Sequence, residues 1–203
     1  MTGVKGTPQG IAGFTLMEML VVMGIFAVVL TAASDIFLAS NRAQRKTLSM
    51  ELVQSDARYA MEAIVREVRS GTIDYSWYAA NAPLSGNGLS SALAIVDGQG
   101  DRILFYHSLA AEECGHADSC IMVSLNGGIA QPITPKGVSV RRASFYVRPT
   151  ADPYAFDHLT GLYGSDEQPR ATVSLEMDSD SVDPREKVSV FLQTTASTRN
   201  FRR

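Results

Sequence analysis

The chain has 203 residues, and its 18 Lys and Arg side chains against 21 Asp and Glu side chains give a net charge of −3. This balance excludes a strongly basic protein that coats nucleic acid, and two cysteines are too few for a disulfide-rich scaffold. The length fits one domain with an additional element.

The first element in the chain is an apolar segment. Residues 14–34 contain one charged side chain, that of Glu18, and no further charge occurs before Asp35. A helix needs about 20 mostly apolar residues to cross a bilayer, so the segment can span a membrane if it tolerates a carboxylate near its start. The residues leave three possibilities open: a signal peptide cleaved after small residues at 32–34, an ordinary signal anchor, or a span whose carboxylate has a function.

The helical pattern continues beyond the apolar segment. Residues 41–70 contain neither Gly nor Pro, and Gly71 is a typical helix-ending residue. We expect one helix from Phe14 to Ser70, about 85 Å long, whose second part is amphipathic. Glu62 and Arg66 are expected to form an ion pair one turn apart. The apolar stripe of the second part, at helical spacing, consists of Val53, Ala57, Ala60, Met61, Ile64 and Val68.

From Thr72 onward the sequence predicts strands. Residues 72–91 are expected to form a long connection, and Gly98–Asp101 and Asn126–Gly128 are hairpin-turn signals. A long helix followed by strands predicts an α+β fold in which one antiparallel sheet covers the helix. The candidate strands are Leu93–Val96, Arg102–Ser108, Cys120–Leu125, Gln131–Ile133, Ser144–Arg148, Ala171–Glu176 and Lys187–Thr194.

The sequence contains no catalytic fingerprint. It has no serine nucleophile elbow, zinc-protease motif, Cys-x-x-Cys pair, phosphate-binding loop or dinucleotide motif. We therefore expect a protein that is not an enzyme. Residues 72–203 carry 11 basic and 15 acidic side chains, which argues against nucleic-acid binding by this region.

The two cysteines, Cys114 and Cys120, admit three interpretations. A disulfide formed in an oxidising compartment would close a seven-residue loop and contribute about 2.4 kcal/mol in the chain-entropy model. A zinc site with His107 and His116 matches no standard ligand spacing. Two reduced thiols are the third interpretation, and the disulfide is favoured.

An acidic cluster lies between the last two candidate strands. Its carboxylates fall within nine residues and supply the oxygen ligands that calcium prefers, but the segment lacks the glycine of an EF-hand loop. The alternative is a solvated acidic hairpin, and no other cofactor is expected. The candidate calcium ligands are Asp178, Asp180, Asp183 and Glu186.

The residues Gly13-Phe14-Thr15-Leu16-Met17-Glu18 resemble the processing site of the type IV prepilin family, and the resemblance continues along the helix to Gly71. It implies that residues 1–13 are a leader, that a prepilin peptidase cleaves after Gly13 on the cytoplasmic side, and that the new amino terminus on Phe14 is methylated.

The resemblance also implies a pilin-like architecture. Residues 14–40 would span the inner membrane, residues 41–71 would continue the helix, and residues 72–203 would form a β-rich head outside the cytoplasm that enters a pilus or pseudopilus fibre. Charge counting weakly favours the reverse orientation, but the resemblance and the disulfide favour an external head. The charges in question are Lys5 before the span and Arg42, Arg45 and Lys46 after it.

Glu18 is expected to act in assembly. A carboxylate in an apolar environment needs a cation or a proton, and cleavage after Gly13 would create a charged amine on Phe14. In a bundle of identical helices, Glu18 of one subunit can pair with that amine on a neighbour and fix the axial register. The alternative is that Glu18 only reaches the membrane interface.

Within the family, the later residues are most similar to J-type minor pseudopilins and W-type minor pilins, and the presence of Glu18 distinguishes the chain from K-type tip subunits. This implies a minor structural subunit of a type IV pilus or type II secretion pseudopilus, with other pilin or pseudopilin subunits and the inner-membrane assembly platform as partners. A membrane-anchored binding domain that does not polymerise and a secreted enzyme are the other classes. The similar stretches are 56–62, 66–69, 168–173 and 192–195.

Overall fold

The computed structural model describes residues 13–115, 118–181 and 185–199. The chain divides into two compact units, Met1–Gln44 and Arg45–Arg203. The predicted divisions at residues 40 and 71 stay predictions. One helix, α1 (Leu16–Ser70), crosses the boundary between the two units as a continuous element of 55 residues.

In the first unit, α1 carries no charged side chain between Glu18 and Asp35. Every described residue from Gly13 to Ser40 is exposed, including Leu16 at 80% and Phe37 at 66%. A largely apolar helix surface with no packing partner among the described residues of its unit is suited to lipid or to the core of a larger assembly. By length and composition α1 is the one helix in the described part of the chain that can cross a membrane.

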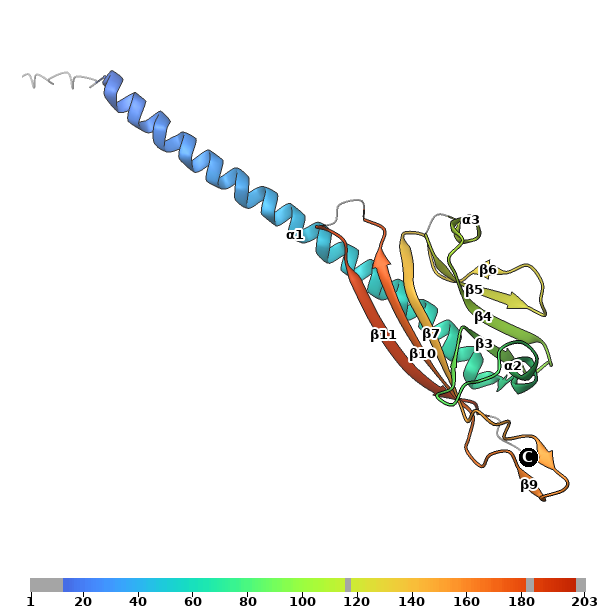
Figure 1. The fold of residues 1–203 in the computed structure, drawn as a ribbon. Helices are drawn as coiled ribbons and strands as arrows, with labels where there is room; N and C mark the ends of the chain where they lie inside the picture. The colour runs from blue at the N-terminus through green and yellow to red at the C-terminus, as the bar shows by residue number, and fades with distance from the viewer. Residues whose placement is uncertain (1–12, 116–117, 182–184, 200–203) are drawn as a thin grey trace, which may run out of the picture. The chain divides into compact units, whose positions relative to one another are not determined.

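The second unit is built from β-strands and two short helices in addition to the end of α1. Figure 1 shows their order along the chain. The helices are α2 (Tyr75–Asn81) and α3 (Ala111–Cys114). The strands are β1 (Thr72–Ile73), β2 (Leu89–Ser90), β3 (Ala92–Val96), β4 (Arg102–Ser108), β5 (Cys120–Leu125), β6 (Gln131–Pro132), β7 (Val138–Arg148), β8 (Phe156–Asp157), β9 (Leu162–Tyr163), β10 (Arg170–Ser179) and β11 (Ser189–Ser197).

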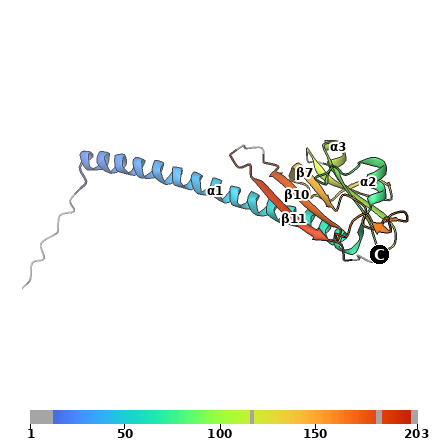
Figure 2. The same cartoon turned by 60° about the horizontal axis from the view of Figure 1, so that its bottom comes forward.

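These strands form two main antiparallel sheets, where the sequence predicted one. The first has the order β1-β3-β4-β5-β6 and the second β11-β10-β7-β2, while β8 and β9 pair separately. Figure 2 shows β7, β10 and β11 side by side. The sheets separate because β7 does not form a ladder with β5. They are joined at Val140, whose N–H donates to the carbonyl of Ser119 at 3.1 Å and whose carbonyl accepts from Ser119 Oγ at 2.7 Å.

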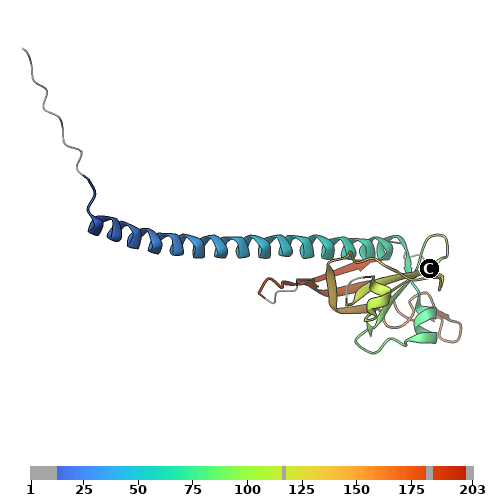
Figure 3. The same ribbon diagram turned by 90° about the horizontal axis from the view of Figure 1, so that it is seen from above.

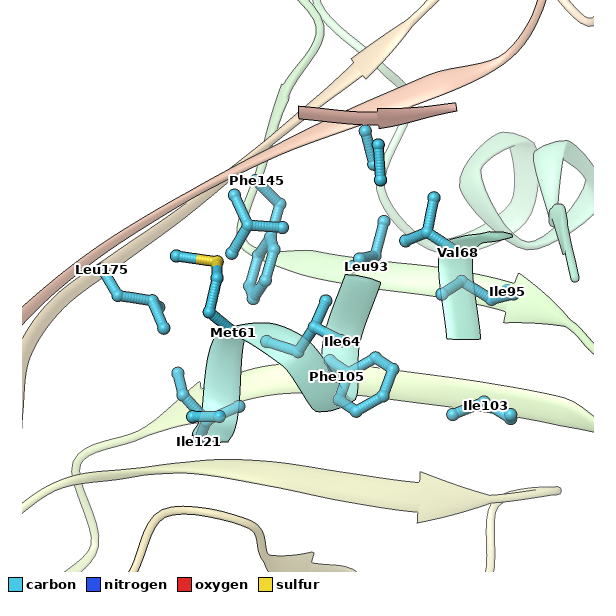
Figure 4. Close-up of a cluster of buried hydrophobic side chains, with 14 of the residues drawn as sticks. Met61, Ile64, Val68, Leu93, Ile95, Ile103, Phe105, Ile121, Phe145 and Leu175 are labelled. Atoms are coloured by element: carbon cyan, nitrogen blue, oxygen red, sulfur yellow. The ribbon is translucent and has the colours of Figure 1, made fainter. Parts of the chain in front are cut away.

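The predicted apolar stripe is the buried face of α1 in the second unit, and the expected α+β architecture is confirmed. All six stripe residues are buried, and Met61 is the most exposed of them at 6%. They join side chains from both sheets in one core. Figure 4 shows Met61 and Ile64 of α1 among Phe105 of the first sheet and Phe145 and Leu175 of the second.

α1 ends immediately before Gly71, as predicted, and close packing leaves no room for a side chain at this position. Its N–H donates to the carbonyl of Glu67 at 2.9 Å. A Cβ at this position would lie 2.6 Å from both Ile95 Cγ2 and the carbonyl oxygen of Val96. A side chain there would therefore collide with β3. Figure 3 shows the end of α1 beside the strands of the second unit.

The expected ion pair between Glu62 and Arg66 was wrong. Arg66 Nε lies 3.3 Å from Oε1 of the adjacent Glu67 instead. The Glu67 side chain is 25% exposed, whereas that of Arg66 is 77% exposed. An exposed pair one turn apart gains little in water, where screening is strong.

Both predicted hairpin turns are confirmed. Gly100 has a φ of 94° between β3 and β4, while Asn126 and Gly127 have φ values of 51° and 71° between β5 and β6. Positive φ values favour Asn and Gly, and the N–H of Gly128 closes the second turn on the carbonyl of Leu125 at 2.8 Å.

The long connection predicted for residues 72–91 contains three regular elements, β1, α2 and β2. Asp74 caps α2 by accepting from Trp77 N–H at 2.9 Å, and Tyr78 of α2 is buried. The Tyr78 hydroxyl donates to Ala92 O and accepts from Ala94 N–H at 3.1 and 3.0 Å, and burial raises the pKa of Tyr78. These bonds tie α2 to β3, a contact that residue periodicity does not reveal.

Asp74 is a buried carboxylate that remains charged. Burial alone would raise the pKa of Asp74, but hydrogen bonds from Ser76, Arg102 and Trp77 outweigh it and hold the pKa below its ordinary value. Arg102 Nε contacts Oδ2 of Asp74 directly. The pair links the start of α2 to the start of β4.

Candidate processing and assembly site

The start of α1 contains the residues of the predicted cleavage motif. Gly13, Phe14 and Thr15 belong to no helix or strand, and α1 begins at Leu16. Thr15 Oγ1 accepts from the N–H of Glu18 at 3.2 Å, and the Thr15 carbonyl accepts from Met19 N–H at 3.2 Å. Thr15 is therefore the N-cap, and the predicted helix start at Phe14 was two residues too early.

The Gly13–Phe14 peptide bond lies in open surroundings. No described heavy atom lies within 4 Å of the position that a Cβ on Gly13 would occupy, and Phe14 is 75% exposed. Neither residue is hydrogen-bonded to another residue in the described part of the chain. A peptidase would meet this bond in an unpaired, non-helical backbone.

Glu18 lies in the first turn of α1. A carboxylate there is favoured by the partial positive charge of the helix N-terminus. Among residues 13–115, 118–181 and 185–199 no basic side chain forms an ion pair with it. Its apolar neighbours Leu20, Val21 and Val22 are all more than half exposed. If other helices cover this surface, the carboxylate needs a cation from outside the chain's described part.

The predicted disulfide is confirmed. Cys114 at the end of α3 and Cys120 at the start of β5 are joined by an S–S bond of 2.05 Å, and both pack against Met122 and Tyr106. The zinc interpretation and the free-thiol interpretation were therefore wrong. His107, a proposed zinc ligand, contacts the carbonyl of Val140 through Nε2 at 2.7 Å, and His116 lies outside the described residues.

The candidate calcium ligands are only partly described. Asp178 is the second-last residue of β10 and accepts from Ser189 Oγ at 2.6 Å, and its Oδ2 lies 3.4 Å from Lys187 Nζ. Glu186 Oε1 lies 4.0 Å from Arg45 Nη1. Asp183 lies outside the described residues. Within them, no three His, Cys, Asp or Glu side chains are grouped to hold a metal ion, so calcium would compete with two cations already in place.

Calcium binding stays a prediction with a direct test. If the cluster holds calcium, calcium at 100 times its Kd raises the free energy of unfolding by about 2.7 kcal/mol, and the melting temperature of the full chain rises. Changing Asp180→Ala together with Asp183→Ala should remove that rise. The matched control is Asp97→Ala in the β3–β4 turn. An unchanged melting temperature of the parent protein would leave the solvated hairpin as the explanation.

The role of Thr15 was missed from the sequence, although a signal was present. Thr15 and Glu18 have the Thr-x-x-Glu spacing of a capping box immediately before an apolar run. The structure contains the threonine half of that arrangement.

The comparison with known families agrees with these residues. The model of the prokaryotic N-terminal methylation motif matches residues 9–34. The match spans the cleavage motif and the first turns of α1, and it supports the type IV pilin and pseudopilin family. No curated protein and no solved structure matches the chain.

Proposed function

We propose that this chain is a minor structural subunit of a type IV pilus or a type II secretion pseudopilus, of the J-type or W-type. A prepilin peptidase cleaves it after Gly13, and it assembles through α1. The observation that carries the proposal is the methylation-motif match at residues 9–34. This match ends inside a helix whose apolar side chains are exposed and have no partner among the described residues of their own unit.

In this proposal α1 performs two tasks in succession. It first spans the inner membrane, with residues 72–203 outside the cytoplasm, where an oxidising compartment suits the disulfide. The assembly platform then draws the subunit from the bilayer into the fibre. The apolar side chains must exchange lipid for the helices of neighbouring subunits, because exposing them to water would be unfavourable.

Glu18 would fix the axial register of neighbouring helices when α1 moves from lipid into the fibre. Apolar helix surfaces slide past one another at little cost, whereas a buried carboxylate must meet a cation. The cation that cleavage creates is the methylated amine of Phe14, which lies four residues before Glu18. Pairing with that amine on a neighbouring subunit would set the axial position of each new helix, as one polar residue sets register in a coiled coil.

The processing step is tested by the mass of the mature N-terminus. Protein from the membrane fraction should lack its first 13 residues, begin at Phe14 and carry one methyl group on the amine. Glu18→Leu should still be cleaved after Gly13, since the cut depends chiefly on Gly13 and the leader. An intact Met1, or a start near Ser34 as expected of a signal peptide, would contradict the proposal.

A further inference from the structure

Strand β11 forms an open edge of the second sheet, because only β10 pairs with it among the described residues. The N–H of Ser179 donates to the carbonyl of Val188 at 2.8 Å, and the N–H of Thr198 donates to the carbonyl of Pro169 at 3.1 Å. Antiparallel strands alternate between hydrogen-bonded and non-hydrogen-bonded pairs, so every second residue of β11 turns its N–H and carbonyl away from β10. The residues with these outward groups are Ser189, Phe191, Gln193, Thr195 and Ser197.

This outward edge is both unpaired and unprotected. In the described part of the chain no hydrogen bond reaches its backbone groups. Exposed strand edges are usually protected by charged side chains, proline or a bulge. The segment Ser189–Ser197 has no charged residue and no proline, its register with β10 is continuous, and Phe191 is 64% exposed. The edge is therefore suited to pairing with a further strand.

There is also space beside β11 for such a strand. A groove of about 580 Å³ lies between α1 and β11 and is lined by Arg58, Met61 and Glu62 of α1 and by Phe191–Thr194. Figure 1 shows β11 as the outermost strand of its sheet. The helix therefore leaves room for the inner-face side chains of an added strand, while the backbone of that strand pairs with β11.

A second copy of this chain does not offer a suitable antiparallel strand. Glu186, just before β11, lies 4.0 Å from Arg45, and the N–H of Arg199, just after β11, donates to the carbonyl of Arg69 at 3.2 Å. Strand β11 thus runs in the same direction as the second part of α1. Antiparallel pairing of two β11 strands would point their α1 helices in opposite directions, which two heads on the same side of one membrane cannot adopt. The opposite edge of the sheet, β2, has only two residues.

We propose that the open edge of β11 binds an extended segment of a neighbouring subunit of different sequence, by antiparallel strand addition. The inference rests on the proposed function as a fibre subunit. The outward backbone groups supply the affinity, and the uncharged side chains of β11 select an uncharged segment without proline. Beside Phe191 the incoming strand should carry a β-branched or aromatic residue, because such cross-strand pairs are favourable.

Photocrosslinking of the full chain in the cells that make it tests this pairing. Benzoylphenylalanine replaces Phe191 in one experiment and Thr195 in another, and the attachment points are mapped by mass. Both should lie on one segment of a different subunit, about four residues apart and in reverse order, because paired antiparallel strands advance residue by residue. Leu159, which is 97% exposed in the β8–β9 turn, is the control position and should not attach to that segment. Attachment to β11 of a second copy, or points without this spacing, would overturn the inference.

A proline variant separates backbone pairing from mere proximity. Gln193→Pro removes an N–H that faces the open edge, not one that bonds to β10, and its ring obstructs the incoming strand. It should lower the crosslink yield from Phe191 about a hundred-fold, whereas Gln193→Ala keeps the N–H and should retain the yield. Trp77 fluorescence during chemical unfolding checks that the proline variant keeps its fold, and if it does not, the two mapped crosslinks decide. An unchanged yield in folded Gln193→Pro would overturn the inference.

Failure of this inference and failure of the proposed function give different results. A parent chain that is not cleaved after Gly13 would overturn the proposed function itself. A parent chain that is cleaved and present in fibres, but forms no crosslink from Phe191 to another subunit, would overturn only the role of β11.

Discussion

Glu18→Leu should abolish incorporation of the subunit into fibres while leaving membrane insertion intact. Leucine makes the apolar segment more favourable in a bilayer, so the amount of protein in the membrane should be equal or higher. In a fibre, however, the amine of Phe14 on the neighbouring subunit would lose its partner. Removing one member of a buried charge pair costs about 3–5 kcal/mol, enough to lower occupancy by more than a hundred-fold. The measurement compares the variant with the parent in sheared fibres and in membranes.

Glu51→Leu is the matched control for that experiment. Glu51 is an exposed acid on the same helix but in the second unit, outside the apolar segment. Its loss should leave fibre content unchanged. Equal fibre content of Glu18→Leu and parent protein would show that the carboxylate has no part in assembly, which is the result expected of an anchored binding domain.

Ile64→Ala should destabilise the second unit by about 2–5 kcal/mol, the range for removing a buried aliphatic side chain and leaving a cavity. Ile64 is fully buried where α1 meets both sheets. The chain has one tryptophan, Trp77, which packs on the same core with its ring centroid 5.2 Å from that of Tyr78. Trp77 fluorescence during chemical unfolding of the full chain in detergent therefore measures the decrease in the free energy of unfolding of the second unit.

Leu48→Ala is the control for the core variant. Leu48 lies on the same helix and in the same unit but is 59% exposed, so its truncation leaves little cavity and should change stability by less than about 0.5 kcal/mol. A similar unfolding midpoint for Ile64→Ala and the parent would contradict the position assigned to α1 in the core.

The second half of α1 was predictable because one physical constraint dominates it. A helix that buries one face must repeat apolar residues at helical spacing, and the stripe from Val53 to Val68 is the buried face of the structure. The turns at Gly100 and Asn126–Gly127 were equally predictable, since few residue types adopt positive φ values.

The division into two sheets was not predictable, because it depends on tertiary contacts. Strand composition shows that β7 is a strand but not which neighbour it pairs with. The first part of β7 was missed because Arg141 and Arg142 interrupt its apolar alternation; both are exposed. Helix α2 was missed because it is held by the Asp74 cap and the Tyr78 hydroxyl rather than by an apolar repeat.

At the candidate site, the residues of the cleavage motif could be identified from the sequence, whereas the backbone conformation around them could not. The sequence indicated Gly13, Phe14 and Glu18 through their spacing before an apolar run. It did not show that α1 starts at Leu16 rather than at Phe14, a difference that involves only local hydrogen bonds from the N–H of Glu18 to the hydroxyl and carbonyl oxygens of Thr15. Such small differences decide where a helix begins.

Mass spectrometry of the N-terminal peptide in sheared, purified fibres tests the central claim most directly. If the chain is a processed fibre subunit, the fibres contain a peptide that begins with N-methylated Phe14, and the precursor beginning at Met1 is confined to the membrane. If the chain is found only in membranes, or begins at Met1 or near Ser34 wherever it is found, it is not a pilin-like subunit.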